Sequence, residues 1–91
     1  MNERETMQEL LLSYVGLLAE RHGYGPGEGF EYKLFDDLLS PHPTLVSEEE
    51  KGELTFLAES LQQWVSFDVE TGMLQLVDFN EWEELLKRRE H

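Results

Sequence analysis

Hydrophobic residues recur at helical spacing between Glu3 and His22, and Gly23 follows at the position of a left-handed C-terminal cap. The pattern predicts a helix over this range. Its apolar surface is broader than one stripe, so the helix either lies at the centre of the fold or is shared with a second chain. The residues concerned are Met7, Leu10, Leu11, Tyr14, Leu17 and Leu18 on the main face, with Leu12, Val15 and Ala19 beside it.

Glycine then occupies every second position from Gly23 to Gly29. A dinucleotide-binding fingerprint requires Gly-x-Gly-x-x-Gly between a strand and a helix, whereas this segment follows a helix and has a different spacing. No Gly-Lys-Ser or Gly-Lys-Thr closes it as in a phosphate loop. We therefore predict a flexible connection, in which Tyr24 is a candidate contact residue.

Two further helices are predicted downstream. Hydrophobic residues at helical intervals indicate one over Phe30–Leu39, which the two prolines of residues 40–43 bring to an end. Ser47 and Glu50 have the spacing of a capping box, and three glutamates in the first turn suit the positive end of the helix dipole. The helix that begins there continues to about Gln63, with Leu54, Leu57, Ala58 and Leu61 on one face.

Phe56 departs from the pattern of this third helix. It lies about 200° around the helix axis from Leu54, on the side that carries Glu49 and Gln63. Either another segment of the chain covers Phe56, or its side chain is an exposed anchor for a partner.

The hydrophobic period changes to two at Trp64, which predicts a β-hairpin with Gly72 in a left-handed turn conformation. Pairing Asp68 with Met73 brings the hydrophobic side chains of the two strands onto one face, whereas a shift of one residue mixes them with polar ones. Trp64 then lies on the opposite face. There it is either the edge of the core or a contact residue.

Asp78 or Asn80 caps a last helix, whose narrow apolar stripe consists of Trp82, Leu85 and Leu86. The sequence therefore predicts a mostly helical α+β fold: three helices, a β-hairpin and a C-terminal helix. This is the element order of a winged helix, a DNA-binding fold in which the third helix enters the major groove. No residue motif supports that resemblance.

Composition predicts a single acidic globular domain over residues 1–91. Hydrophobic residues make up 40% of the chain, and the formal net charge is −13. The third helix contains five glutamates against Lys51 alone, so phosphate groups repel it and we expect no direct binding of nucleic acid.

The residues offer no recognisable catalytic, cofactor or metal site. Cysteine is absent, and the histidines at 22, 42 and 91 form no His-x-x-x-His pair. Ser40 and His42, with Asp36 or Asp37, contain the residue types of a catalytic triad but lack the strand–turn–helix context of a nucleophile elbow. We therefore expect the protein not to be an enzyme.

No export signal or stretch long enough to span a bilayer is visible, so the expected location is the cytoplasm, with no membrane contact. A fixed negative surface either keeps the protein soluble or steers it to a basic partner. The second hypothesis makes it an acidic interaction module, such as an inhibitor, an immunity-type protein or an adaptor. An alternative is an assembly subunit that oligomerises, for example as a homodimer, through the apolar face of the helix at 3–22. The predicted partner-binding residues are Tyr24, Glu49, Glu53, Phe56 and Trp64.

Overall fold

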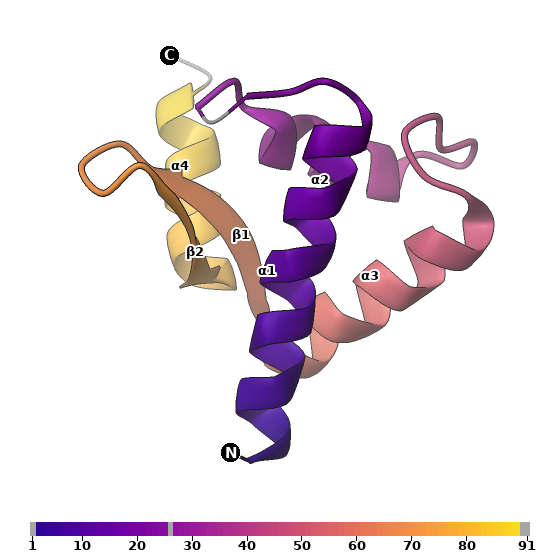
Figure 1. Cartoon of the computed structure of the whole chain (residues 1–91), viewed down its shortest axis with the longest axis horizontal. Helices are drawn as coiled ribbons and strands as arrows, with labels where there is room; N and C mark the ends of the chain where they lie inside the picture. The colour runs from indigo at the N-terminus through magenta and orange to yellow at the C-terminus, as the bar shows by residue number, and fades with distance from the viewer. Residues whose placement is uncertain (1, 26, 90–91) are drawn as a thin grey trace.

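The computed structural model describes residues 2–25 and 27–89 and contains, within them, four helices and one antiparallel β-hairpin (Figure 1). The elements follow in the predicted order, which confirms the mostly helical α+β fold. They are α1 (Glu3–Arg21), α2 (Phe30–Leu39), α3 (Glu48–Leu61), β1 (Gln63–Asp68), β2 (Met73–Asp78) and α4 (Phe79–Arg89).

Local hydrogen bonds explain where the helices begin and end. The Asn2 side chain accepts from the backbone N–H of Glu5 at 2.8 Å and starts α1, and Gly23 follows its end with φ of 76°. At α3 the predicted capping box is confirmed. Ser47 Oγ accepts from the Glu50 backbone at 3.1 Å, while the Glu50 carboxylate accepts from the Ser47 backbone at 2.9 Å.

The hairpin has the predicted register, in which Asp68 pairs with Met73. Gly72 adopts φ of 72°, and the Asp68 carboxylate accepts from the backbone N–H of Glu70 at 2.9 Å inside the turn. Because pairing fixes which face each side chain occupies, Val65 and Trp64 lie on opposite faces of the sheet. Both are buried, so both faces of the hairpin are covered.

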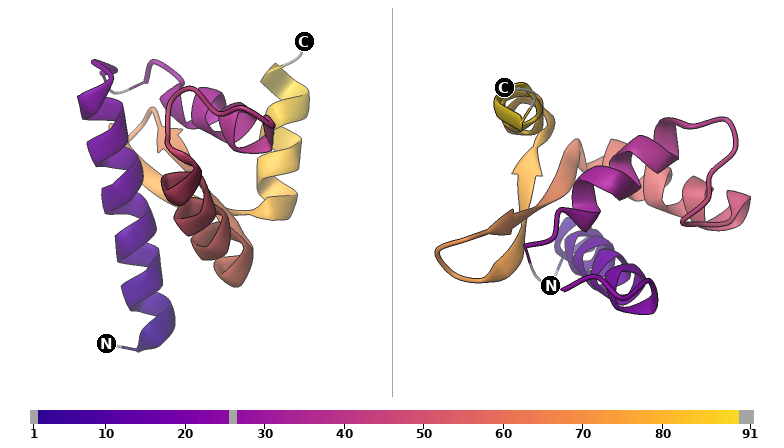
Figure 2. Two further views of the ribbon diagram at one scale, coloured as in Figure 1. Left: turned by 90° about the vertical axis from the view of Figure 1, so that its right-hand side faces the viewer. Right: turned by 90° about the horizontal axis from the view of Figure 1, so that it is seen from above.

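The hairpin lies between α1 on one side and α4 on the other, as Figure 2 shows from above. Helix α1 packs against the hairpin, and Val15 lines a cleft whose other side carries Phe67 and Leu74. Leu85 of α4 meets the face that carries Val77. Because α4 covers the second face, Trp64 lies inside the fold.

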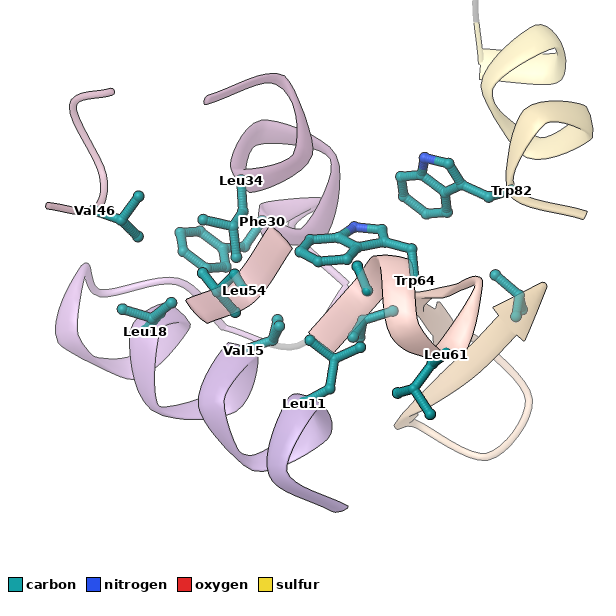
Figure 3. Packing of buried hydrophobic residues seen from close by; sticks show 13 residues of the cluster. Leu11, Val15, Leu18, Phe30, Leu34, Val46, Leu54, Leu61, Trp64 and Trp82 are labelled. Atoms are coloured by element: carbon teal, nitrogen blue, oxygen red, sulfur yellow. The ribbon is translucent and has the colours of Figure 1, made fainter. Parts of the chain in front are cut away.

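The hydrophobic core gathers residues from every helix and both strands (Figure 3). Trp64 is 0% exposed, and its indole N–H donates to the backbone carbonyl of Glu31 at 3.0 Å. Phe35 contacts both tryptophans, with ring centroids 5.9 Å from Trp64 and 5.4 Å from Trp82. The prediction that Trp64 contacts a partner is therefore wrong, because α2 and α4 enclose the ring.

The segment between α2 and α3 is fixed by polar contacts. The Asp37 carboxylate accepts from the backbone N–H groups of Thr44 at 2.7 Å and Leu45 at 3.0 Å. The His22 imidazole in turn contacts the Leu45 carbonyl at 2.8 Å. These bonds hold the start of α3 beside the end of α1. No described helix combines the length and the apolar composition needed to cross a membrane.

Candidate functional site

Helices α1 and α3 pack side by side in opposite directions. At one end, the Arg4 guanidinium donates to the Leu61 carbonyl at 3.2 Å. At the other end, Arg21 forms an ion pair with Glu50 at 3.1 Å. The beginning of each helix therefore lies near the end of the other, and their outward sides adjoin along the seam.

The core face of α1 differs from the predicted one. Leu11, Val15 and Leu18 are buried, whereas Leu10 is 54% exposed and Leu17 is 66% exposed. All five belong to the broad apolar surface predicted from the sequence, but its centre is rotated. The helix is thus central in the fold, and it also presents two leucines to solvent.

Leu10 and Leu17 lie on the flank of α1 that is nearest α3. Tyr14 and Arg21, which share this flank, lie close to Glu53 and Glu50 of α3. With about 100° of rotation per residue, Leu10 and Leu17 lie beside Tyr14 and Arg21 on the helix surface, farther from the buried side of α1. Their side chains therefore border the seam between the two helices on its solvent side.

Phe56 lies on the solvent side of α3, about 200° around the helix axis from the buried Leu54. Its side chain is 65% exposed, so of the two interpretations of this residue the structure supports the exposed one. Glu49 and Glu53 are exposed on the same side of α3, since residues three, four and seven apart share a helix face. We call the solvent-facing residues of these two adjacent helices, Leu10 and Leu17 of α1 and Glu49, Glu53 and Phe56 of α3, the outer face.

The outer face is acidic, and Arg21, which borders it, is already paired with Glu50. Within residues 2–25 and 27–89, neither Glu49 nor Glu53 has a basic side chain within ion-pair distance. Tyr14 is half-buried under this surface. Burial, and after it the neighbouring carboxylates of Glu50 and Glu53, together raise the pKa of its phenol to about 12.

Most of the basic side chains are bound elsewhere in the fold. Lys33 donates to the Tyr24 hydroxyl at 3.1 Å, and Lys51 donates to the Ser40 carbonyl. Arg89 lies over the Tyr32 ring, 4.5 Å from its centroid. These interactions keep the positive charges away from the outer face.

No protein-family model, curated protein or solved structure matches this chain. Function is therefore inferred from the residues themselves. Among the described residues, no group of three or more His, Asp or Glu side chains is arranged to hold a metal ion.

Three of the predicted contact residues come together, and two do not. Glu49, Glu53 and Phe56 share the outer face, whereas Trp64 is in the core. Tyr24 is half-buried in the connection between α1 and α2, where its ring packs on Phe30 with centroids 4.9 Å apart. Leu10 and Leu17 were missing from the predicted set, because the periodicity of α1 assigned them to its core face.

The structure also reveals a cleft that the sequence did not suggest. It has a volume of about 230 Å³ and lies between α1, the glycine-rich connection, α2 and the tip of the hairpin. Glu31 of α2 lines it, although only 5% of this residue is exposed. A buried glutamate has no periodic signature, because helical patterns are read from hydrophobic positions.

Proposed function

We propose that this protein is a small acidic docking module that binds a basic surface of another protein through the outer face. The observation that carries this proposal is the exposed Phe56 ring, which has Glu49 and Glu53 beside it and no cation paired with either. Exposed aromatic residues supply much of the affinity at protein interfaces. Carboxylates around such an anchor supply association rate and specificity toward a positive partner.

The charge of the whole chain supports the same proposal. A net charge of −13 produces a long-range field that accelerates the approach of a basic protein. The field repels nucleic acid, and α3 with its five glutamates repels it most. The proposed role is binding rather than catalysis, as an inhibitor, immunity-type protein or adaptor, and its proposed location is the cytoplasm.

The test compares matched variants of the outer face in capture from cell extract, followed by titration of the purified partner. Phe56→Ala removes the anchor, and the double variant Glu49→Gln, Glu53→Gln removes the charges. We expect Phe56→Ala to weaken binding at least about tenfold, as is typical of an interface anchor. The double variant lowers the association rate, and its effect shrinks as salt is added.

The controls make equivalent changes elsewhere. Val69→Ala removes an exposed hydrophobic residue at the tip of the hairpin, and Glu81→Gln removes one charge from α4. If the partner binds through the outer face, both control variants are expected to bind it as tightly as the wild type does. A partner that binds Phe56→Ala as tightly as the wild type contradicts the proposal, as does equal loss of binding in all four variants.

Self-assembly is a second candidate, favoured by the exposure of Leu10 and Leu17 on α1. A symmetric dimer through this face brings the Glu49 and Glu53 carboxylates of two copies close together, which is unfavourable. We therefore rank a basic partner first. Light scattering during size-exclusion chromatography separates the two: a dimer that Leu17→Gln dissociates supports assembly, and a monomer at high concentration excludes it.

A further inference from the structure

The cleft between α1 and the hairpin tip combines aromatic walls with carboxylates. Tyr24, Phe30 and Phe67 line it, together with Glu20 of α1 and Glu31 of α2. The backbone comes close to the cleft at Gly16, Gly25, Gly27 and Gly72. At about 230 Å³ the cleft is smaller than the usual pocket for a drug-sized ligand, which starts near 300 Å³. Its size suits a single side chain.

Glu31 is the unusual residue of this cleft. The residue is only 5% exposed, and no described residue donates a hydrogen bond to its carboxylate or forms an ion pair with it. Its carboxylate oxygens are not sealed inside the fold, since among the described residues only Trp82 Nε1 is a fully buried side-chain polar atom without a partner. The backbone carbonyl of Glu31 is used separately, by the indole N–H of Trp64. A carboxylate that opens into a narrow cleft and has no internal partner can pair with a cation that enters the cleft.

Lys33, two residues along α2 from Glu31, does not fill this role. Lys33 packs against the Tyr24 ring, 4.5 Å from its centroid, and donates to the Tyr24 hydroxyl. It is on the exposed side of α2 and does not line the cleft. The second carboxylate of the cleft, that of Glu20, adds to the negative potential. Cationic groups are also attracted to the faces of aromatic rings such as those of Tyr24 and Phe67.

We infer that this cleft receives a lysine side chain from the basic partner protein, an inference that rests on the proposed function. The unbranched alkyl stem of lysine packs along the aromatic walls, and its compact ammonium group reaches Glu31. Arginine fits less well, because its planar guanidinium is wider than the compact ammonium group and the cleft has a volume of only about 230 Å³. An apolar side chain leaves Glu31 without a partner.

The inference is tested by titrating the isotope-labelled protein with Nα-acetyl-lysine N-methylamide and following backbone amide shifts by NMR. We expect saturable shifts at Gly16, Gly25 and Gly27, which line the cleft. The norleucine analogue has the same stem without the charge and is expected to give no saturable shift there. The arginine analogue is expected to bind more weakly than the lysine one.

Variants identify the carboxylate responsible. Glu31→Gln keeps the size of the side chain and removes its charge, and we expect it to weaken lysine binding about tenfold, the loss of one charged hydrogen bond. Glu81→Gln, which lies against the other face of the hairpin, is the matched control and leaves binding unchanged. A second variant, Glu31→Met, also removes binding and serves if Glu31→Gln folds poorly.

Several outcomes overturn the inference: equal binding of the norleucine analogue, tighter binding of the arginine analogue, shifts spread over the surface without saturation, or full binding by Glu31→Gln. Each is independent of the outer face, because the probe is a small molecule and needs no Phe56 anchor. If partner capture depends on Phe56 and the probe does not bind, the docking module stands without a lysine cleft. If the probe binds and no partner is captured, the proposed function fails instead.

Discussion

The outer face and the cleft differ in how they hold their carboxylates. Glu49 and Glu53 extend from α3 into solvent, where ions screen them over about 8 Å at physiological salt. Glu31 of α2 is only 5% exposed and lines the narrow cleft beside the hairpin, where less solvent surrounds its carboxylate. Exposed carboxylates attract a basic protein from a distance and in many orientations. A buried carboxylate acts only at contact, on a group that fits the cleft.

This difference separates two stages of recognition. Exposed charges mainly change the association rate, and that effect declines as salt increases. Contacts in a desolvated cleft mainly change the dissociation rate and depend less on salt. Substitutions at the two places are therefore expected to affect different steps of the same binding reaction.

The largest expected difference concerns the aromatic residue that supports each region. Trp64 is enclosed in the core and bonded to the backbone of Glu31, whereas Phe56 is mostly in solvent. Trp64→Ala leaves a cavity and is expected to lower the free energy of unfolding by about 3–5 kcal/mol. Phe56→Ala is expected to change it by less than about 0.5 kcal/mol. Urea denaturation measures both, and a large loss in Phe56→Ala contradicts the exposure of that ring.

The elements themselves could be predicted from sequence because their signals are local. The capping box of Ser47 and Glu50 depends on residues within one helical turn. The register of the hairpin depends on the alternation of hydrophobic and polar residues in the two strands that flank the turn at Gly72. The position of Trp64 depends on α4, which begins 15 residues later and covers the second face of the hairpin. Periodicity alone therefore left open whether Trp64 was buried.

The candidate site was predictable in part for the same reason. Phe56 stands out against the apolar face of its own helix, so the sequence indicated its exposure as one alternative. The exposure of Leu10 and Leu17 could not be predicted, because α1 is hydrophobic over much of its circumference and tertiary packing decides which side is buried. The Glu31 cleft requires four separate segments to meet, and no pattern within one segment predicts such an arrangement.

A second prediction concerns the energetic cost of the cleft carboxylate. Glu31→Met replaces a carboxylate that has no partner among the described residues with an apolar side chain of similar length, and we expect it to stabilise the free protein by about 1 kcal/mol. Glu53→Met makes the same substitution on the exposed outer face and is expected to have an effect within about 0.5 kcal/mol. Thermal denaturation at neutral pH compares the two. Destabilisation by Glu31→Met would mean that the carboxylate has an internal partner.

Each region also contains a glycine whose replacement sharpens the contrast. Gly27 has φ of 80°, and an added Cβ lies 3.1 Å from the Phe67 ring in the cleft. Gly27→Ala is therefore expected to destabilise the protein by about 1–2 kcal/mol. Gly52 lies inside α3 with open space around its Cα, so Gly52→Ala is expected to stabilise by about 0.5–1 kcal/mol. In urea denaturation, Gly27→Ala is expected to lower the free energy of unfolding and Gly52→Ala to raise it. Changes in the same direction for both variants contradict the prediction.

The smallest predicted effect concerns the ion pair at the end of the α1–α3 seam. Hydrogen bonds from Arg21, and then from the Ser47 backbone, lower the pKa of Glu50 below its usual value of 4.5. Because the folded-state pKa is lowered, the stabilisation is present above about pH 4.5 and is lost as the pH falls through the folded-state value. Both partners are partly exposed, so we expect about 0.5 kcal/mol at neutral pH.

Glu50→Gln isolates this charge, because glutamine also completes a capping box. The wild type is expected to be the more stable protein at pH 7, with the difference shrinking toward pH 3 in denaturant unfolding. Glu49→Gln, one residue earlier and without a basic partner among the described residues, serves as the control and lacks this pH-dependent difference. The prediction is contradicted if the stability difference between Glu50→Gln and wild type stays constant from pH 7 to pH 3. In that case the ion pair with Arg21 contributes nothing, and the hydrogen bond to Ser47 alone holds this end of α3.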